Sequence, residues 1–138
     1  LRCSCDDKNV YFLVEVLDRS LLRGDYATVY LSSGDSKSLT NGAKRLQVSM
    51  DGLKSTETYA GKWNNAEMGV EVKTYVCNDT NEDRIDNYGY IAEISVPRSS
   101  LTISSGQVLV NFSITDNKEE EAVSDVSSIS RWIPVAGL

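Results

Sequence analysis

The segment GYIAEISVP, residues 89–97, alternates like a β-strand and ends in a proline. The even-numbered positions from Tyr90 to Val96 are apolar and share one face, whereas Glu93 stands in the middle of the other face. Pro97 ends the strand because proline has no N–H to give to a sheet ladder. A carboxylate on such an outward face either meets plain water or belongs to a site that handles a ligand.

The same alternation recurs along the chain, and turn signals separate the alternating segments. Asp51-Gly52 is the strongest hairpin signal, and the tetrad 6–9 is a second one. We expect loops elsewhere, including the acidic segment 77–87, and a loop or single helical turn at 118–121. The expected strands are 1–5, 10–17, 27–32, 45–50, 53–59, 68–76, 89–97, 107–115 and a last one within RWIPV (131–135).

Short strands with turns between them, and little helical periodicity, predict an all-β fold, either a sandwich or a barrel. We expect an antiparallel two-sheet β-sandwich of jelly-roll type, with little or no helix, as one domain over residues 1–138. The chain opens on Leu1 without Met, which suggests a piece of a longer protein. Side chains in matching phase should form a common core: Phe12, Val14, Val16, Val72, Ala92, Ile94, Val110, Phe112 and Ile114.

Composition excludes several classes of function. The formal net charge of −6 disfavours phosphate backbones and anionic lipid, so we expect no nucleic-acid partner and no binding to membrane surfaces. The sequence has no apolar run long enough for a membrane-spanning helix, so we expect no membrane insertion. The chain contains no histidine, which removes the commonest general base and the usual Ser–His and Cys–His nucleophile pairs.

The three cysteines are Cys3, Cys5 and Cys77. The spacing of Cys3 and Cys5 does not favour a mutual disulfide, and an odd count leaves at least one thiol free. A bridge from either residue to Cys77 stays open. We expect small buried side chains instead, and a stability that does not depend on disulfides.

The order of several short segments resembles the family 9 carbohydrate-binding modules that accompany xylanases and other glycan-degrading enzymes. The segments that carry the resemblance are DDKNVYFLVEVLD (6–18), GDYATVYL (24–31), RLQVSMDG (45–52), GYIAEISVPRSSL (89–101) and GQVLVNFSITDN (106–117). The resemblance implies that Tyr90 anchors the core and that Glu93 occupies the family's usual acid position. The alternative for Glu93 is an ion pair with a Lys or Arg of a neighbouring strand.

The chain departs from this family at the sugar site. Modules of the family that grip sugar ends do so between two tryptophans, and the first of these positions is Leu22 here. Thr28 replaces an expected glutamate, and Gln47 and Ser49 replace an expected arginine and asparagine. Trp132 could supply the second tryptophan or be a core residue. The resemblance therefore implies the fold together with a largely rebuilt site.

Aromatic rings bind sugars by stacking on their C–H faces while amides and carboxylates take up the hydroxyls. The candidate carbohydrate-binding residues are Trp132 and Trp63, with Gln47, Asn111 and Glu93 as polar partners. The alternative for Trp63 is a partly buried loop anchor. Most tyrosines should simply cover strand faces, and the ones considered are Tyr11, Tyr26, Tyr30, Tyr59, Tyr75 and Tyr88.

One segment has the oxygen-ligand spacing of a calcium loop. Asp79, Asn81 and Asp83 stand at alternate positions, but Arg84 replaces the glycine that should follow. The alternative is a solvated acidic loop. We expect no cofactor; a structural calcium, which the resemblance also permits, stays open.

The sequence favours a non-catalytic carbohydrate-binding module, secreted or on the cell surface, that targets a parent glycan-processing protein to polysaccharide or oligosaccharide. Its partners would be carbohydrate and the catalytic or adhesion domains of the parent chain. An enzyme without histidine would need a carboxylate pair, and no pair stands out among the 20 acids. The alternative is a structural or protein-interaction β-sandwich of a cell-surface protein that has lost the sugar site.

Overall fold

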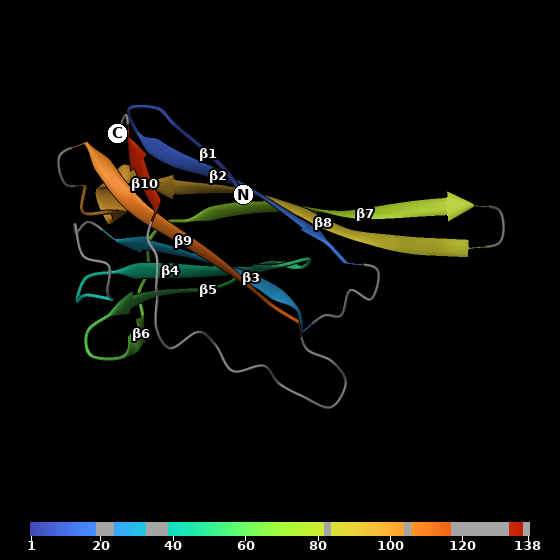
Figure 1. Cartoon of the computed structure of the whole chain (residues 1–138), viewed down its shortest axis with the longest axis horizontal. Helices are drawn as coiled ribbons and strands as arrows, with labels where there is room; N and C mark the ends of the chain where they lie inside the picture. The colour runs from blue at the N-terminus through green and yellow to red at the C-terminus, as the bar shows by residue number, and fades with distance from the viewer. Residues whose placement is uncertain (19–23, 33–38, 82–83, 104–105, 117–132, 137–138) are drawn as a thin grey trace.

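The computed structural model describes residues 1–18, 24–32, 39–81, 84–103, 106–116 and 133–136, and for 78–81, 84–88 and 133–136 it describes the backbone alone. These residues form two antiparallel sheets in two layers, as Figure 1 shows, so the predicted all-β sandwich is confirmed. The described residues contain one 3-10 turn, η1 (Arg98–Ser100), and no α-helix.

The first sheet has four strands in the order β1-β2-β8-β7. The hairpin predicted around residues 6–9 joins its first two strands, and β2 pairs along its whole length with β8. The bounds of its strands are β1 (Arg2–Cys5), β2 (Asn9–Leu17), β7 (Glu71–Asn81) and β8 (Arg84–Pro97).

The second sheet has six strands in the order β10-β9-β3-β4-β5-β6. The hairpin predicted at Asp51-Gly52 is present between β4 and β5, whereas the short strand β6 was not expected. The bounds of its strands are β3 (Tyr26–Ser32), β4 (Lys44–Ser49), β5 (Gly52–Tyr59), β6 (Trp63–Asn65), β9 (Gln107–Thr115) and β10 (Ile133–Ala136).

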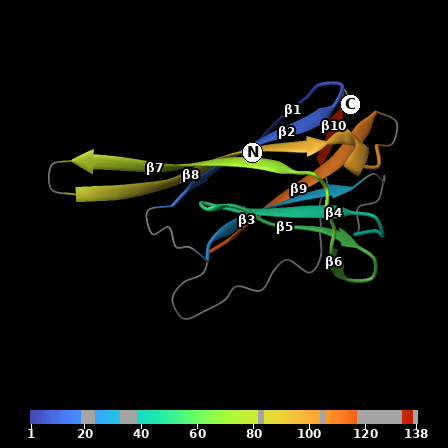
Figure 2. The same ribbon diagram turned by 180° about the vertical axis from the view of Figure 1, so that it is seen from behind.

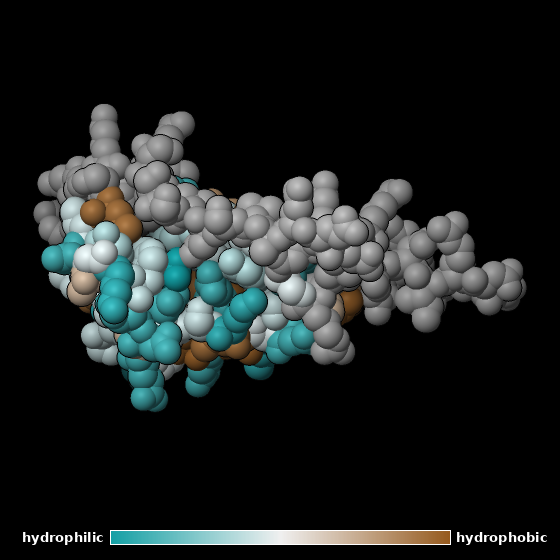
Figure 3. Space-filling model, turned by 90° about the horizontal axis from the view of Figure 1, so that it is seen from below, coloured by the Kyte–Doolittle hydropathy of each residue, from teal (hydrophilic) through white to brown (hydrophobic). Residues whose placement is uncertain are grey.

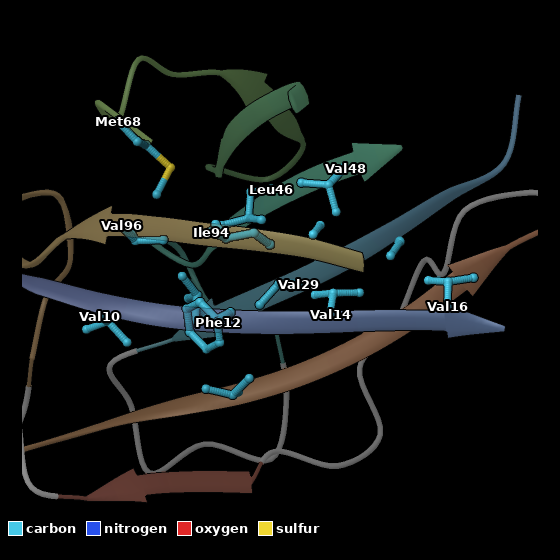
Figure 4. Close-up of a cluster of buried hydrophobic side chains, with 14 of the residues drawn as sticks. Val10, Phe12, Val14, Val16, Val29, Leu46, Val48, Met68, Ile94 and Val96 are labelled. Carbon is cyan, nitrogen blue, oxygen red and sulfur yellow. The ribbon is translucent and has the colours of Figure 1, made fainter. Parts of the chain in front are cut away.

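The core lies between the sheets, where the inward positions of β2, β8, β3, β4 and β9 meet (Figure 4). Hydrogen bonds between described residues also join the two layers. The Tyr90 hydroxyl donates to the Val48 carbonyl at 3.1 Å, and the Thr74 hydroxyl donates to the Met50 carbonyl at 2.9 Å. The first bond satisfies a phenol that the apolar core would otherwise leave unpaired.

The predicted core is confirmed for six of its nine members, which are buried: Phe12, Val14, Val16, Ala92, Ile94 and Val110. Val72 and Phe112 are only partly buried against that core. The prediction for Ile114 is wrong, because its side chain is 51% exposed. Ile114 lies opposite Ala27, but β10 pairs only with residues 107–110, so the second half of β9 forms an edge of the described sheet.

The loop predicted over residues 77–87 is also wrong. β7 continues to Asn81 and β8 starts at Arg84, so the two strands form a hairpin arm that extends beyond the sandwich (Figures 1 and 2). A bulge between Cys77 and Asn78 lies near the base of the arm. The backbone of the arm extends away from the second sheet (Figures 1 and 2), and its sequence has no apolar alternation to reveal a strand.

Candidate functional site

A groove of about 650 Å³ crosses the outer face of the four-stranded sheet. Each of the four strands contributes three consecutive residues to its lining: 2–4, 11–13, 71–73 and 93–95. The register places these segments side by side, so the groove runs across the strands from β1 to β7. It is therefore elongated and built on paired backbone.

The outward side chains of the groove form two cross-strand rows. Residues paired in register point to the same side of the sheet, so each row contains one residue from every strand. Two acids and two bases are distributed over the rows, together with hydroxyl groups and two larger side chains from β2. One row is Arg2, Leu13, Glu93 and Lys73, and the other is Ser4, Tyr11, Ser95 and Glu71.

Tyr11 is held in place through its hydroxyl, which donates to Asp6 Oδ2 at 2.7 Å. The other oxygen of Asp6 accepts from the backbone N–H groups of Lys8 at 2.8 Å and Asn9 at 2.7 Å. The Asn9 amide also donates to the Tyr11 hydroxyl at 3.3 Å. Because the β1–β2 turn fixes Asp6, and Asp6 fixes the phenol, the Tyr11 ring is oriented in advance in the groove.

The pKa values of this pair follow from the same bonds. The bond from Tyr11, and after it the Asn9 and Lys8 amides, lower the pKa of the Asp6 carboxyl, since all of them favour the carboxylate. The bond to Asp6 raises the pKa of the Tyr11 hydroxyl, because the proton is shared with an anion. At neutral pH the phenol is the donor and the carboxylate the acceptor.

Glu93 lies in the groove, exposed, between Leu13 of β2 and Lys73 of β7. The expected outward position is confirmed. Lys73 is also the neighbouring-strand cation on which the ion-pair alternative depends. The sequence did not show that Lys73 lies opposite Glu93, because a loop was expected over 77–87 and the β7–β8 register shifts at a bulge between Cys77 and Asn78.

Trp63 lies on the other side of the molecule, on the outer face of the six-stranded sheet. Its ring makes an edge contact with Tyr59 at 5.3 Å between centroids, and a tilted contact with the buried Tyr30 at 6.0 Å. The guanidinium of Arg45 lies 4.5 Å above the indole, and Arg45 also forms an ion pair with Glu57. Trp63 is thus a half-buried anchor whose ring already has protein neighbours.

Gln47 and Asn111 share this outer face with Trp63. Gln47 is buried and its oxygen accepts from the Ser55 hydroxyl at 3.0 Å, while Asn111 accepts from the Phe112 N–H at 2.7 Å. The face, seen from the side of β5 and β6, presents mostly hydrophilic side chains (Figure 3). The structure therefore brings Trp63, Gln47 and Asn111 onto one face, and it places Glu93 on the opposite face.

Three of the positions at which the chain departs from the family 9 modules lie within the described residues and are buried in the six-stranded sheet. Thr28 is fully buried, and Gln47 and Ser49 are nearly so. Leu22 and Trp132 lie outside the described residues. The described members of the sugar-end site implied by the resemblance are therefore inaccessible in this chain.

Three carboxylates that the sequence analysis did not nominate converge at one end of the sandwich. Oxygen atoms of Asp18, Asp25 and Asp116 lie within 4.8 Å of one another, and Asp25 is buried. Each aspartate directly precedes or follows a strand, which is the signal that could have found them. Clustered carboxylate oxygens are ligands that calcium accepts.

The nominated metal ligands Asp79 and Asn81 belong to β7, so the calcium loop expected there is replaced by a strand. Their side chains, and the whole of Asp83, lie outside the described residues.

None of the three cysteines forms a disulfide, as expected, and Cys5 and Cys77 are half-buried. The expectation of small buried side chains is wrong for Cys3, which is exposed on the edge strand β1. Partial desolvation, and after it the neighbouring Cys5, raise the pKa of the Cys3 thiol.

None of the described segments is a helix long and apolar enough to cross a membrane. Comparison of the chain with protein-family models, with curated proteins and with solved structures finds no match.

Proposed function

We propose that the protein is a non-catalytic carbohydrate-binding module whose binding face is the groove on the four-stranded sheet. The observation that supports this most directly is the Tyr11 ring, which Asp6 holds in a groove of about 650 Å³. An aromatic ring fixed before binding offers a platform for the C–H face of a sugar, and little side-chain entropy remains to be lost.

The polar side chains of the groove match what sugar hydroxyls require. Arg2 and Lys73 donate hydrogen bonds only, whereas Glu71 and Glu93 accept them, so a hydroxyl can bridge from an acceptor to a donor. Charge-assisted hydrogen bonds of this kind are the stronger ones. The resemblance to family 9 carbohydrate-binding modules supports the same class of ligand, although the binding face differs.

A module of this kind targets its parent protein to a glycan. It works by raising local concentration, so weak affinity at each site is sufficient. The proposal includes a secreted or cell-surface parent chain with catalytic or adhesion domains, as the resemblance implies.

We favour binding over catalysis because the groove is wide and lies on an open sheet face. Glu71 and Glu93 lie diagonally on neighbouring strands and are the carboxylate pair that a glycosidase acting in this groove would use. Incubating the protein with each bound glycan and assaying new reducing ends tests this directly. If the protein releases sugar and the Glu93→Gln variant does not, the protein is an enzyme and not a binding module.

The main experiment combines a glycan array with titration calorimetry on the best ligand. Tyr11→Ala should weaken binding by about tenfold or more, since base- or sugar-sized rings stacked on an aromatic side chain contribute on the order of 1–3 kcal/mol. Tyr75→Ala is the matched control, because Tyr75 is an exposed tyrosine on the same sheet outside the groove lining.

Trp63→Ala and Trp132→Ala test the two tryptophans that the sequence nominated. Trp63→Ala should leave affinity unchanged once folding is verified, because Trp63 lies on the opposite face. If Tyr11→Ala still binds and either tryptophan variant does not, the binding site lies outside the groove.

A second candidate function is a protein-interaction sandwich, and exposed apolar side chains favour it. Leu17 is 81% exposed at the end of β2, and Tyr75 and Val76 are exposed on β7. Such residues are typical of docking surfaces. Absence of binding to every glycan, together with a partner lost on Leu17→Ser, would establish this function instead.

A further inference from the structure

The shape of the groove bears on which part of a glycan it takes, an inference that rests on the proposed function. The lining includes β1 and β7, which are the two outer strands of the described four-stranded sheet. A ligand lying in the groove therefore reaches both edges of this sheet. The groove has the form of a crossing path and not of a pocket that encloses a chain end.

The length of the groove suits several sugar rings. From β1 to β7 there are three spacings between neighbouring strands, which together amount to roughly 14 Å. A single ring on Tyr11 would leave the ends of the groove empty. The side chains at those ends, Arg2 on β1 and Lys73 on β7, would then make no contact with the ligand.

The charges in the groove point to an uncharged ligand. Arg2 and Lys73 balance Glu71 and Glu93, and Lys73 lies directly opposite Glu93. The groove thus offers no excess of either sign to a charged polymer. The whole chain has a formal net charge of −6, which repels uronate- or sulfate-bearing polysaccharides at a distance.

We propose that the groove binds an interior segment of a linear, uncharged polysaccharide that lies across the strands. One sugar ring rests on Tyr11 and Leu13 of β2, and the hydroxyls of the flanking rings meet Arg2 at one end and Lys73 at the other. Glu93 on β8 is the acceptor for the ring in between, and Glu71 is the acceptor at the β7 end. Recognition therefore needs neither the reducing nor the non-reducing end of the chain.

The test uses cello-, xylo- and manno-oligosaccharides from one to about six units, each in native and borohydride-reduced form, titrated by calorimetry. For the series that binds, affinity should rise by about tenfold or more from one to four units and then level off. Reduction of the chain end should change the Kd of the longer members by less than about twofold. A monosaccharide that binds as tightly as a tetrasaccharide, or binding lost on reduction, overturns the proposal.

Two variants test the contribution of each end of the groove to binding. Arg2→Gln and Lys73→Gln should each weaken a hexasaccharide by about threefold, and the double variant should show the product of the two effects. An effect from only one end would indicate a closed subsite and contradict the crossing path. Preference for polygalacturonate or a sulfated glycan would refute the assignment to uncharged ligands.

Failure of this proposal can be told apart from failure of the proposed function. End-dependent or charge-dependent glycan binding removes this inference and leaves a carbohydrate-binding module. If the protein is folded by circular dichroism but binds no glycan, both the inference and the proposed function are wrong.

Discussion

Glu93 and Gln47 are polar residues on outward positions of central strands, yet their surroundings differ. Glu93 is exposed in the groove, whereas Gln47 is buried and bonded to Ser55. Both positions look alike in an alternating sequence. At the residue scale, pattern therefore fixes the direction of a side chain but not its access to solvent.

The two phenylalanines provide a test of depth in the core. Phe12 is buried at the centre of β2, while Phe112 is only partly buried on β9. We expect Phe12→Ala to lower the free energy of unfolding by about 3–5 kcal/mol through cavity formation. Phe112→Ala should cost clearly less. Urea denaturation of both variants measures this, and equal losses would contradict the difference in burial.

Tyr90 predicts a pH dependence at alkaline pH. Burial raises the pKa of its hydroxyl from 10.0 to about 12. The unfolded chain therefore loses this proton first as the pH rises, which favours unfolding. The stability that depends on the protonated phenol is complete below pH 10 and is lost as the pH rises through about 12.

Tyr90→Phe removes both the titration and the bond to the Val48 carbonyl. We expect it to cost about 1 kcal/mol at neutral pH and to flatten the decline of stability between pH 10 and 12. Denaturation midpoints across that range are the measurement. A variant that declines as steeply as the parent would show that another group is responsible.

At the element scale, the sandwich is built mainly from hairpins and long-range antiparallel pairs. The β2–β8 pair extends from Asn9↔Pro97 to Leu17↔Gly89 and joins segments about eighty residues apart. Gly89 is at the end of this pair with a φ of +121°. A Cβ at that position would lie 1.8 Å from the Val16 carbonyl oxygen, so the close approach of the strands requires glycine.

Gly89→Ala should therefore lower the free energy of unfolding by more than about 3 kcal/mol, because backbone strain and a backbone clash add together. Gly52→Ala is the matched control, since Gly52 has a similar φ of +117° but no atom within 4 Å of its Cβ position. The control should lose only roughly 1–2 kcal/mol from strain. Thermal or urea unfolding compares the two, and a larger loss at Gly52 would refute the clash.

At the scale of the whole molecule, the sandwich presents two outer faces that differ in character. One holds the groove with Tyr11, and the other holds the anchored Trp63. The candidate residues chosen from the sequence lie on both faces, with Glu93 on the first and Trp63 on the second. Any ligand that contacts Glu93 therefore cannot at the same time contact Trp63 on one protein molecule.

The free thiols predict a stability that is independent of redox conditions. No disulfide joins any two of the three cysteines, so a reductant has no disulfide to break. The melting temperature should be the same with and without a phosphine reductant. Mass spectrometry under non-reducing conditions should show three free thiols, and a bridge to Cys77 would contradict the structure.

Glycan binding should be weak and nearly independent of salt. One tyrosine platform with hydroxyl bonds should give a Kd of roughly millimolar to tens of micromolar, or about 4–6 kcal/mol. Titrations from low salt to about 0.5 M should change the Kd little, because an uncharged ligand has no net charge to screen. A steep loss of affinity with salt would indicate an ionic ligand.

Much of the fold could be predicted from the sequence because its rules are local. Alternation located β2, β3, β4, β5 and β9 within about two residues, and the turn signals at 6–9 and 51–52 identified the β1–β2 and β4–β5 hairpins. The sequence did not predict the arm of β7 and β8 beyond Cys77, because this segment has no apolar alternation. Ile114 was misplaced because an inward direction guarantees burial only where another element covers the strand.

The sequence by itself determined the all-β class, the direction of most strand side chains and the outward carboxylate at Glu93. Only the tertiary structure decided which outward residues meet. Arg2 and Tyr11 come from the local β1–β2 hairpin and Lys73 and Glu93 from β7 and β8, and the long-range β2–β8 register makes the two pairs neighbours in one groove. In the six-stranded sheet, the tertiary structure likewise buried Gln47 and covered Trp63. Pairing between distant strands is set by the packing of both faces at once and not by any local signal.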